Sequence, residues 1–325
     1  MPKEITHWIL AEKAYGQLPD RSRLKAIIEE HRHLYLIGAV LPDAPYVYLI
    51  GPHKARIRRA ALAIHDPKES SFDPLKNLIE HYRRPNVPDF VWALIAGVVA
   101  HFYADATLHP MVFYFAGNDG SNRQTEIRHN TIETALDLHY LNRVRLKNRE
   151  LFFVSLRGMA ASFGELSEFL ALLLGLDPKR SVGLMKRIIG YYSLTQWSFS
   201  KGWLLRMLIW LNGLPGIDLE SKLNYFYPKY QAVDLPFFRN EIRYRHPVTG
   251  EPQRKTIAEL ESDFLADMKL LETLETDLIQ NPDPEFSCLR NRPNLLTGLF
   301  GTTSRDMRFF DTAYDLSPLE KLDSP

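Results

Sequence analysis

The stretch FVWALIAGVVAHFYADATLHPM (residues 90–111) decides how the rest of the chain is interpreted, because it joins a strongly apolar run to three polar side chains. His101, Asp105 and His109 follow one another at intervals of four residues, a spacing that places them near one face of a helix. Histidine and aspartate are both metal ligands in proteins. The stretch therefore predicts a buried helix that ends in ligand-capable side chains.

The same stretch is apolar enough to raise the question of whether it spans a membrane. Its longest apolar run, near residues 90–104, is shorter than the roughly 20 residues that a membrane span needs, and it runs straight into His101 and Asp105. We therefore expect a buried helix of a soluble protein. The start, MPKEITHWIL, has no basic region followed by an apolar one, so it does not indicate a secretory signal. These features predict a cytoplasmic protein.

Composition narrows the classes of function. The chain has 325 residues, with 40 Lys and Arg against 39 Asp and Glu, a formal net charge of +1. This balance weakens a nucleic-acid-binding interpretation, although it is compatible with a local basic patch. Cys288 is the only cysteine, which excludes an intramolecular disulfide framework and a cysteine-based zinc finger. Any bound metal must therefore be held by histidines and carboxylates.

Helical periodicity dominates the chain. One segment opens with Thr256 and Glu259, the spacing of a capping box. Strand signals are sparse, and only EIRYRHPVTGEP (241–252) alternates and turns like a small hairpin. Helices are expected over residues 4–16, 20–38, 55–63, 72–84, 89–109, 124–147, 150–174, 179–194, 198–212 and 256–280.

The predicted fold is all-α: a single large multi-helix domain with at most a small hairpin near 241–252. Within it, residues 1–148 form a metal-site helical region. Residues 149–325 add further helices and an irregular tail from about residue 281, packed on the first region. Ten of the eleven histidines lie within residues 1–139. Because histidine is the commonest metal ligand and proton shuttle, the chemistry is expected in that first region.

Two helical pairs have the spacing of chelating ligands. His101 and Asp105 form H-x-x-x-D, and His129 and Glu133 form H-x-x-x-E, so each pair offers a nitrogen and an oxygen one turn apart. His109 lies a further turn along and precedes a proline, where we expect the helix to kink or end. Further candidates lie upstream, and these are His7 in an apolar helical setting, Asp43 in a proline-bounded loop, and His65.

Each of these residues has an ordinary structural interpretation. A single histidine on an apolar face is more often a hydrogen-bonded core residue, and an H-x-x-x-D pair is often a surface ion pair. An aspartate between prolines, as in LPDAP, is by default a turn former or a helix cap. The combination changes the balance, because burying five histidines and three carboxylates without partners would cost kilocalories for each group. Bound cations would supply the partners, and eight ligands suit two or three ions. The lack of thiolates favours hydrolytic over structural zinc.

The order of these segments resembles the zinc-dependent phospholipases C of bacteria, which are related to the fungal single-strand-specific zinc nucleases. The resemblance covers roughly residues 4–145. It implies an all-α fold with a zinc cluster between the helices of the N-terminal half, holding two or three ions. The matching ligands, in chain order, are His7, Asp43, His65, His101, Asp105, His109, His129 and Glu133.

The resemblance also implies a division of labour. Asp43, His65, His101 and Asp105 would surround one zinc, and His109, His129 and Glu133 would hold a second. His7 would bind a third, with Asp105 bridging the first and third ions. Asp43 is the expected general base or water-orienting group. The family differs in a longer interval between the residues that match Asp105 and His109, and its third zinc also binds the processed N-terminal residue.

The implied reaction is in-line attack of zinc-bound hydroxide on a phosphodiester. Tyr46 and Tyr103 are candidate substrate-binding residues that could pack on a choline-like headgroup, stack on bases or fill the core. The expected partners are a phosphodiester substrate, with phospholipid as the favoured class, and a peripheral membrane contact. A single-strand nuclease and a non-catalytic, metal-stabilised helical protein are the alternatives.

Two further sets of residues are weaker candidates. Asp66, Asp137 and His139 could orient ligand imidazoles, although solvated surface positions are the more ordinary interpretation. The apolar segments 150–174 and 202–214 could contact acyl chains or a bilayer. Core helices are the more common meaning of such segments.

Overall fold

The computed structural model describes ten stretches of the chain, and every structural statement below refers to them. They comprise residues 4–48, 51–83, 87–118, 122–143, 162–199, 201–219, 223, 226, 236–279 and 286–316.

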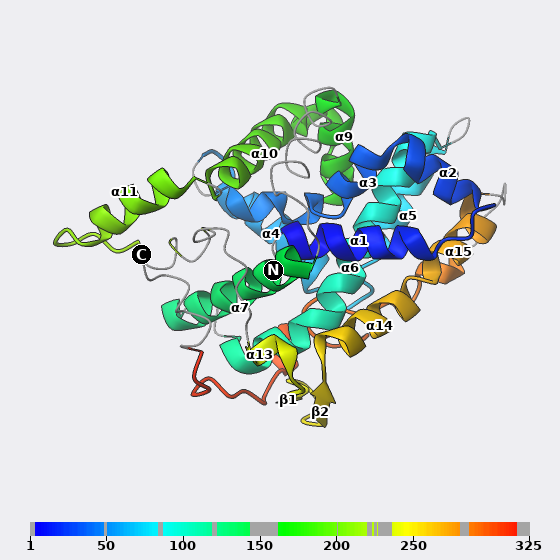
Figure 1. Ribbon diagram of the computed structural model, residues 1–325. Coiled ribbons are helices and arrows are strands. Elements are labelled where there is room, and N and C mark those ends of the chain that lie inside the picture. The colour runs from blue at the N-terminus through cyan, green and yellow to red at the C-terminus, as the bar shows by residue number, and fades with distance from the viewer. Residues whose placement is uncertain are drawn as a thin grey trace.

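The described residues form an all-α fold with one two-stranded sheet (Figure 1). This confirms the predicted fold class. A 3₁₀ segment, Leu41–Val47, lies between α3 and α4. The helices are α1 (Glu4–Gln17), α2 (Arg23–Glu30), α3 (Arg32–Gly38), α4 (Lys54–His65), α5 (Asp73–Tyr82), α6 (Asp89–Ala116), α7 (Arg123–Arg143), α9 (Phe163–Leu173), α10 (Pro178–Phe199), α11 (Gly202–Asn212), α13 (Pro236–Arg239), α14 (Ile257–Asp267) and α15 (Leu270–Leu274).

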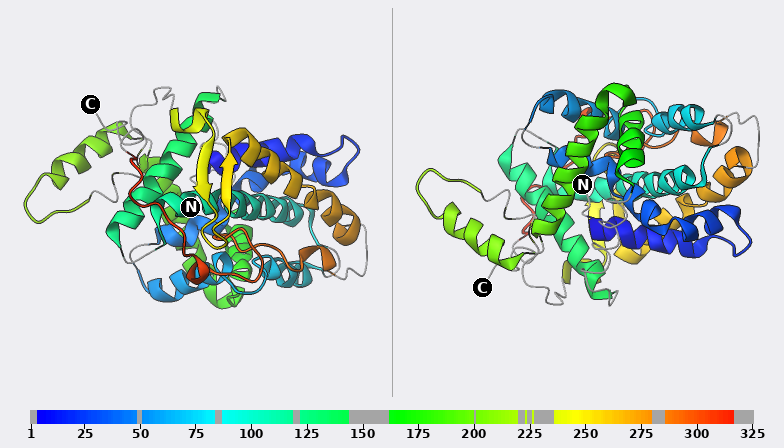
Figure 2. Two further views of the ribbon diagram at one scale, coloured as in Figure 1. Left: turned by 90° about the horizontal axis from the view of Figure 1, so that it is seen from below. Right: turned by 90° about the horizontal axis from the view of Figure 1, so that it is seen from above.

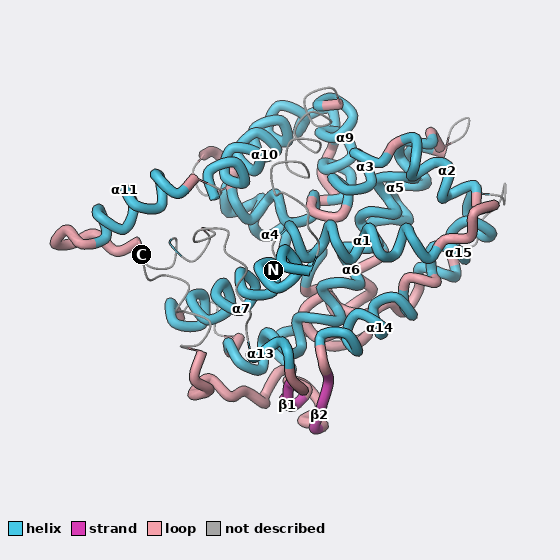
Figure 3. The backbone as a smooth tube through the Cα atoms, viewed as in Figure 1, coloured by secondary structure: helices cyan, strands magenta, loops and turns pink. Residues whose placement is uncertain are grey.

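Helix α6 is the central element, and α1, α2, α3, α7 and α14 all contact it (Figure 3). It has 28 residues, so by length and by its hydropathy of 1.5 it could cross a membrane. It is thus longer than its apolar run suggested. However, 94 % of its most apolar window is buried inside the protein, which is the pattern of a core helix.

Helix α6 does not end at His109 as predicted, but continues through Pro110 to Ala116. Proline has no N–H, so the carbonyl of Ala106 loses its helical partner at this point. The apolar residues beyond the proline, which include Val112 and Phe115, are fully buried. Their burial offsets the lost hydrogen bond, because each large apolar side chain removed from water contributes about 1.5–3 kcal/mol.

Glycines let α3 approach α6 closely. A Cβ atom on Gly97 would lie 2.1 Å from the carbonyl oxygen of Tyr35 and 2.8 Å from the Cα atom of Gly38. No other residue type fits at that separation, because real Cβ contacts are never so short. The close approach brings the backbone of Ala39, just after α3, to the face of α6 that carries His101.

Two predicted helices are each divided in the structure. The segment 20–38 forms α2 and α3, with a break at His31 that lets both helices contact α6. The segment 256–280 forms α14, which begins with the predicted capping box, then α15 and a π-helical turn. That turn places the Glu275 carboxylate where Ser22 and the backbone of Arg23, at the start of α2, donate hydrogen bonds to it.

The remaining boundaries differ less. Helix α10 extends to Phe199, beyond the predicted end at residue 194, and α11 begins at Gly202 rather than at residue 198. Part of two predicted helices, 144–147 and 150–161, lies outside the described residues, and so does the proposed division of the chain at residue 148.

The second half of the chain contacts the first. The predicted hairpin is present but extends past residue 252: β1 (Ile242–Arg245) pairs with β2 (Pro252–Lys255) in antiparallel register. Both β1 and α14 contact α6. The described part of the tail, residues 286–316, is irregular except for two 3₁₀ turns. It crosses the face that carries the hairpin, which is seen from below in Figure 2.

Candidate metal centre

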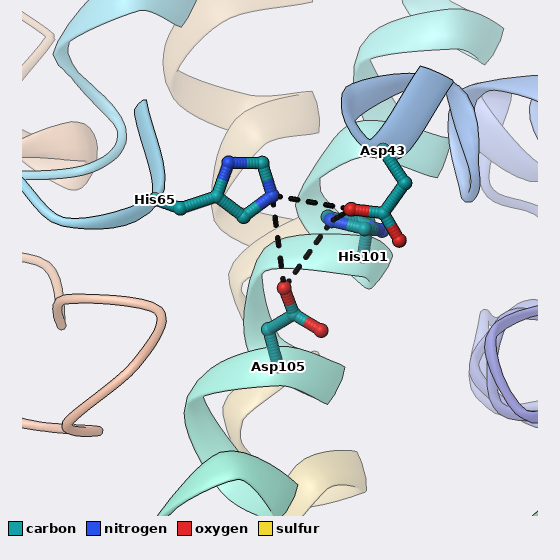
Figure 4. A group of neighbouring side chains, drawn as sticks. All are labelled: Asp43, His65, His101 and Asp105. Atoms are coloured by element: carbon teal, nitrogen blue, oxygen red, sulfur yellow. Dashed lines mark hydrogen bonds and ion pairs between the residues drawn. The ribbon is translucent and has the colours of Figure 1, made fainter. Parts of the chain in front are cut away.

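Four of the candidate ligands form one buried cluster, the Asp43 cluster, drawn in Figure 4. Asp43 comes from the 3₁₀ segment, His65 ends α4, and His101 and Asp105 lie one turn apart on α6. One ligand atom of each residue lies within 4.8 Å of all the others. The Nε2 atoms of His65 and His101 lie 3.2 and 3.5 Å from Oδ1 of Asp43. Nε2 of His101 lies 3.3 Å from Oδ2 of Asp105.

Backbone carbonyls orient both imidazoles of this cluster. Nδ1 of His65 donates to the carbonyl of Ala61 at 2.9 Å, and Nδ1 of His101 donates to the carbonyl of Ala39 at 3.0 Å. Each Nε2 is therefore left without a proton when the ring is neutral, and it points into the cluster. Metal-binding histidines are held in this way in most proteins, because the second hydrogen bond fixes the tautomer and the ring orientation.

Three further ligands form a second group, the His109 cluster. Nε2 of His129 and Oε1 of Glu133 lie 2.7 Å apart on adjacent turns of α7. Nε2 of His109, on α6, lies 3.7 Å from the same oxygen. Nδ1 of His109 donates to the carbonyl of Leu295 at 2.8 Å, so its Nε2 is free to face α7.

His7 and Asp105 connect the groups. Nε2 of His7, on α1, lies 3.4 Å from Oδ1 of Asp105 and 3.9 Å from Oδ2 of Asp43. Its ring stacks on that of His101, with the centroids 4.2 Å apart. The other oxygen of Asp105 faces the Asp43 cluster and lies 3.8 Å from Nδ1 of His109. Asp105 is thus the shared member of the whole arrangement.

The start of α1, and with it His7, is held by Asp137 of α7. Its carboxylate accepts hydrogen bonds from the backbone N–H groups of Ile5 and Thr6, at 3.3 and 2.8 Å, and from the hydroxyl of Thr6 at 2.6 Å. Asp137 is fully buried, so the ordinary interpretation as a solvated residue is wrong. It positions the helix that carries a candidate ligand.

The two other weak candidates, Asp66 and His139, also make contacts within the protein. Asp66 accepts hydrogen bonds from Asn294 and Ser304, and so it anchors the tail rather than an imidazole. His139 is buried, with its ring against Tyr140 and Phe238.

Burial and the neighbouring charges shift the pKa values of the side chains in the centre. Burial, aided by the neighbouring His101, lowers the pKa of His7 to about 3. Burial also opposes charge on His101, but the carboxylates of Asp43 and Asp105 outweigh it and raise its pKa to about 9. The pKa of Asp105 is lowered despite its burial, because the histidines around it stabilise the carboxylate.

The residues fit a metal ion on chemical grounds. Six buried atoms of His7, His101, Asp105 and His109 have no hydrogen-bond partner among the described residues, although a buried polar atom left alone costs about 1–3 kcal/mol. They are both ring nitrogens of His7, Nε2 of His101, Nε2 of His109 and both carboxylate oxygens of Asp105. Imidazole nitrogens and carboxylate oxygens are ligands that zinc accepts, and two nitrogens with two oxygens suit its tetrahedral coordination.

The two tyrosines predicted to bind substrate are separated. Tyr46 is half-buried at the edge of the Asp43 cluster, with its ring 5.1 Å from that of His65. Tyr103 is not at the cluster, because it lies two residues from both His101 and Asp105 and so faces the other side of α6. There it is buried against Phe72, and its hydroxyl accepts a hydrogen bond from Arg292 at 3.1 Å.

Two groups at the centre were not among the predicted site residues. Phe113 is half-buried beside the His109 cluster, with its ring 5.5 Å from that of His109 and 5.0 Å from that of His129. Its position one turn after His109 was the available signal. The tail contributes the Leu295 carbonyl, and no side-chain pattern could indicate this, because any residue type supplies a backbone carbonyl.

Comparison with known proteins agrees with this geometry. A family described as zinc dependent phospholipase C matches residues 6–174, a range that contains all eight candidate ligands. No curated protein and no solved structure matches the chain.

Proposed function

The chain belongs to the zinc-dependent phospholipase C family, and from this membership we propose that it is a zinc-dependent phosphodiester hydrolase with phospholipids as its substrate class. The observation that supports the proposal is the pair of buried clusters joined by Asp105. The Asp43 cluster would hold one ion, the His109 cluster a second, and His7 with Asp105 a third. Bound zinc would lower the pKa of a coordinated water to about 7 and offset the charge of a phosphate group.

Asp43 is the residue that we propose orients the attacking water and accepts its proton. Its side chain keeps 10 % of its surface exposed, whereas the side chain of Asp105 is fully buried. Two prolines, Pro42 and Pro45, flank it in the 3₁₀ segment and restrict its backbone. In this reaction the water oxygen bonds to phosphorus and Asp43 receives the proton of that water. The bond to the leaving oxygen breaks on the opposite side, and the leaving alkoxide takes up a proton from solvent.

The rim of the centre suits an amphiphilic substrate. Tyr46 lies on the Asp43 side and Phe113 on the His109 side, and both are half-buried. The side chain of His129 keeps 15 % exposure, so the second cluster is also open to a small group. We propose that the phosphate would lie between these aromatic rings, with apolar contacts for the rest of the lipid.

The test compares two aspartate variants at equal zinc. Asp43→Asn keeps the shape of the side chain but removes the proton acceptor, so hydrolysis should fall by about 10²–10⁴-fold. Asp20→Asn, at a fully exposed aspartate, is the control and should match the unmodified protein. Zinc per chain is measured by elemental analysis, and hydrolysis with phosphatidylcholine, bis(p-nitrophenyl) phosphate and single-stranded DNA.

Three results would contradict parts of the proposal. Fewer than about two ions per chain, or ions away from His101 in an anomalous map, would overturn the ligand assignment. Full activity of the Asp43 variant would overturn its role. A zinc-loaded protein that hydrolyses DNA alone would be a nuclease, and one that hydrolyses none of the three substrates would be a metal-stabilised protein without this activity.

A further inference from the structure

Helix α11 exposes an apolar face. None of its residues is buried, and the helix extends from the end of α10 away from the body in Figure 1 and in both views of Figure 2. Trp203, Met207 and Trp210 follow at intervals of four and three residues, which places them on one stripe of α11, and Leu214 lies just after the end of the helix. Their exposed fractions are 57, 42, 66 and 36 %. Apolar stripes normally face a core, so this one is unpartnered in the described structure.

The end of α10 enlarges this surface. Leu194 is 60 % exposed and Trp197 is 40 % exposed. Nine of the thirteen exposed large apolar side chains in the described residues fall within residues 191–217, and the others are Leu62, Phe300, Phe309 and Tyr314. We call this surface the α10–α11 patch, defined by Leu194, Trp197, Trp203, Met207, Trp210 and Leu214. Contiguous exposure of this kind marks an interaction surface, because scattered apolar residues alone would need no explanation.

The charged residues within the patch are basic. Lys201 and Arg206 are the only charged residues in the sequence between Leu194 and Leu214, and the first acidic residue after them is Asp218. Lys201 lies with Nζ 4.7 Å from the centre of the Trp197 ring, and Arg206 is exposed beside the stripe on α11. Basic residues together with tryptophan and leucine are typical of helices that lie in the surface of an anionic membrane.

The patch is attached to the elements that hold the metal-binding residues. Helix α10 contacts the 3₁₀ segment of Asp43, and the ring of Tyr191 lies 5.6 Å from that of Tyr48. The hydroxyl of Tyr192 donates to Glu4, at the start of α1, at 3.1 Å. A surface bound by the patch is therefore held next to the elements that frame the centre.

We propose that the α10–α11 patch binds the surface of an anionic phospholipid bilayer. Helix α11 has 11 residues and is about 16 Å long, so it lies in the interface rather than spanning the membrane. The tryptophans place their rings at the headgroup level and the basic side chains contact anionic headgroups. The choice of a lipid surface over a second copy of the chain rests on the proposed function and on the basic charge of Lys201 and Arg206 within the patch.

Sedimentation with vesicles tests the proposal. Full-length protein is mixed with vesicles of phosphatidylcholine and phosphatidylglycerol, or of phosphatidylcholine alone, with a chelator present so that the lipid is not hydrolysed. The double variant Trp203→Ala, Trp210→Ala should bind the anionic vesicles at least about tenfold more weakly. Arg206→Gln should weaken this binding about fivefold, the equivalent of about 1 kcal/mol per basic residue, and should not change binding to phosphatidylcholine alone.

The controls separate this proposal from the catalytic one. Phe300→Ala removes an aromatic side chain of similar exposure elsewhere and should bind as the unmodified protein does. Hydrolysis of bis(p-nitrophenyl) phosphate by zinc-loaded double variant should be unchanged, which also shows that the variant is folded. Because vesicle binding is measured with the chelator present, binding by the patch is detected even if the chain hydrolyses none of the substrates.

Two outcomes would overturn the proposal. One is sedimentation of the double variant equal to that of the unmodified protein, or no sedimentation of either. The other is a dimer, detected by light scattering, that the double variant abolishes while neither protein binds vesicles. That result would assign the patch to contact between two copies of the chain.

Discussion

Gly298 links the tail to the His109 cluster, and its replacement by alanine should weaken that cluster. Gly298 closes the turn whose Leu295 carbonyl accepts the hydrogen bond from His109, and its own N–H donates to Asn294 at 2.9 Å. Its φ angle is +70°, in the left-handed region. A Cβ atom here would lie 2.5 Å from the carbonyl oxygen of Ala106 and 3.2 Å from Cγ of Pro110. Because the first neighbour is backbone, the turn must move away from α6.

The magnitude follows from two costs. The left-handed conformation costs an alanine about 1–2 kcal/mol. Forcing an extra methyl group against a packed helix costs about 1–3 kcal/mol more, so Gly298→Ala should lower the free energy of unfolding by about 2–5 kcal/mol. Movement of the Leu295 carbonyl also releases His109, and loss of such a second hydrogen bond typically reduces metal affinity by about 10–100-fold.

Gly301→Ala is the matched control, because Gly301 has a φ of +77° but open space where its Cβ would lie. It should show the conformational cost alone and no change in metal affinity. The free energy of unfolding is measured in urea with chelator present, and zinc affinity is measured by competition with a chromophoric chelator. The reasoning would be refuted if the two variants were equally destabilised, or if Gly298→Ala bound zinc as tightly as the unmodified protein.

Two further predictions concern α1 and the metal itself. Asp137→Ala leaves the N–H and hydroxyl of Thr6 buried without their carboxylate, so the free energy of unfolding measured in urea should fall by about 2–6 kcal/mol. Elemental analysis should also show loss of the zinc ion at His7. A change in unfolding free energy below about 1 kcal/mol would contradict the anchoring role. Removal of zinc by a chelator should lower the melting temperature, because an ion held at a thousand times its dissociation constant stabilises the fold by about 4 kcal/mol. Added zinc should restore the melting temperature and added magnesium should not, since magnesium avoids imidazole; equal recovery with both ions would argue against nitrogen ligands.

Much of the candidate site was predictable because its pairs are local. A separation of four residues on a helix brings side chains together whatever the rest of the fold does, so His101 with Asp105 and His129 with Glu133 followed from spacing alone. The helical class followed in the same way, from the period of the apolar residues. The ligand set as a whole came from the resemblance in chain order, since no local rule connects His7 to Asp43.

The expectations for the end of α6 and for Asp137 differ from the structure because of long-range packing, and that for Tyr103 differs because of the geometry of a single helix. Proline has a high cost inside a helix, so sequence favoured an end at His109, yet burial of the residues after Pro110 outweighs that cost. Tyr103 looked like a neighbour of the site because it lies between two ligands in sequence, but helical geometry turns it to the opposite face. Asp137 looked solvated because a lone aspartate usually is.

The helical class, the candidate ligand types and the two chelating pairs follow from the sequence, because all of them depend on contacts within one or two helical turns. The position of Asp105 between His7, the Asp43 cluster and His109 follows from the tertiary structure, and so does the orientation of two imidazoles by the backbone carbonyls of Ala39 and Leu295. Such contacts join residues up to 186 positions apart, so no local pattern encodes them. They depend on how closely helices pack, and at Gly97 and Gly298 that closeness depends on the absence of a single methyl group.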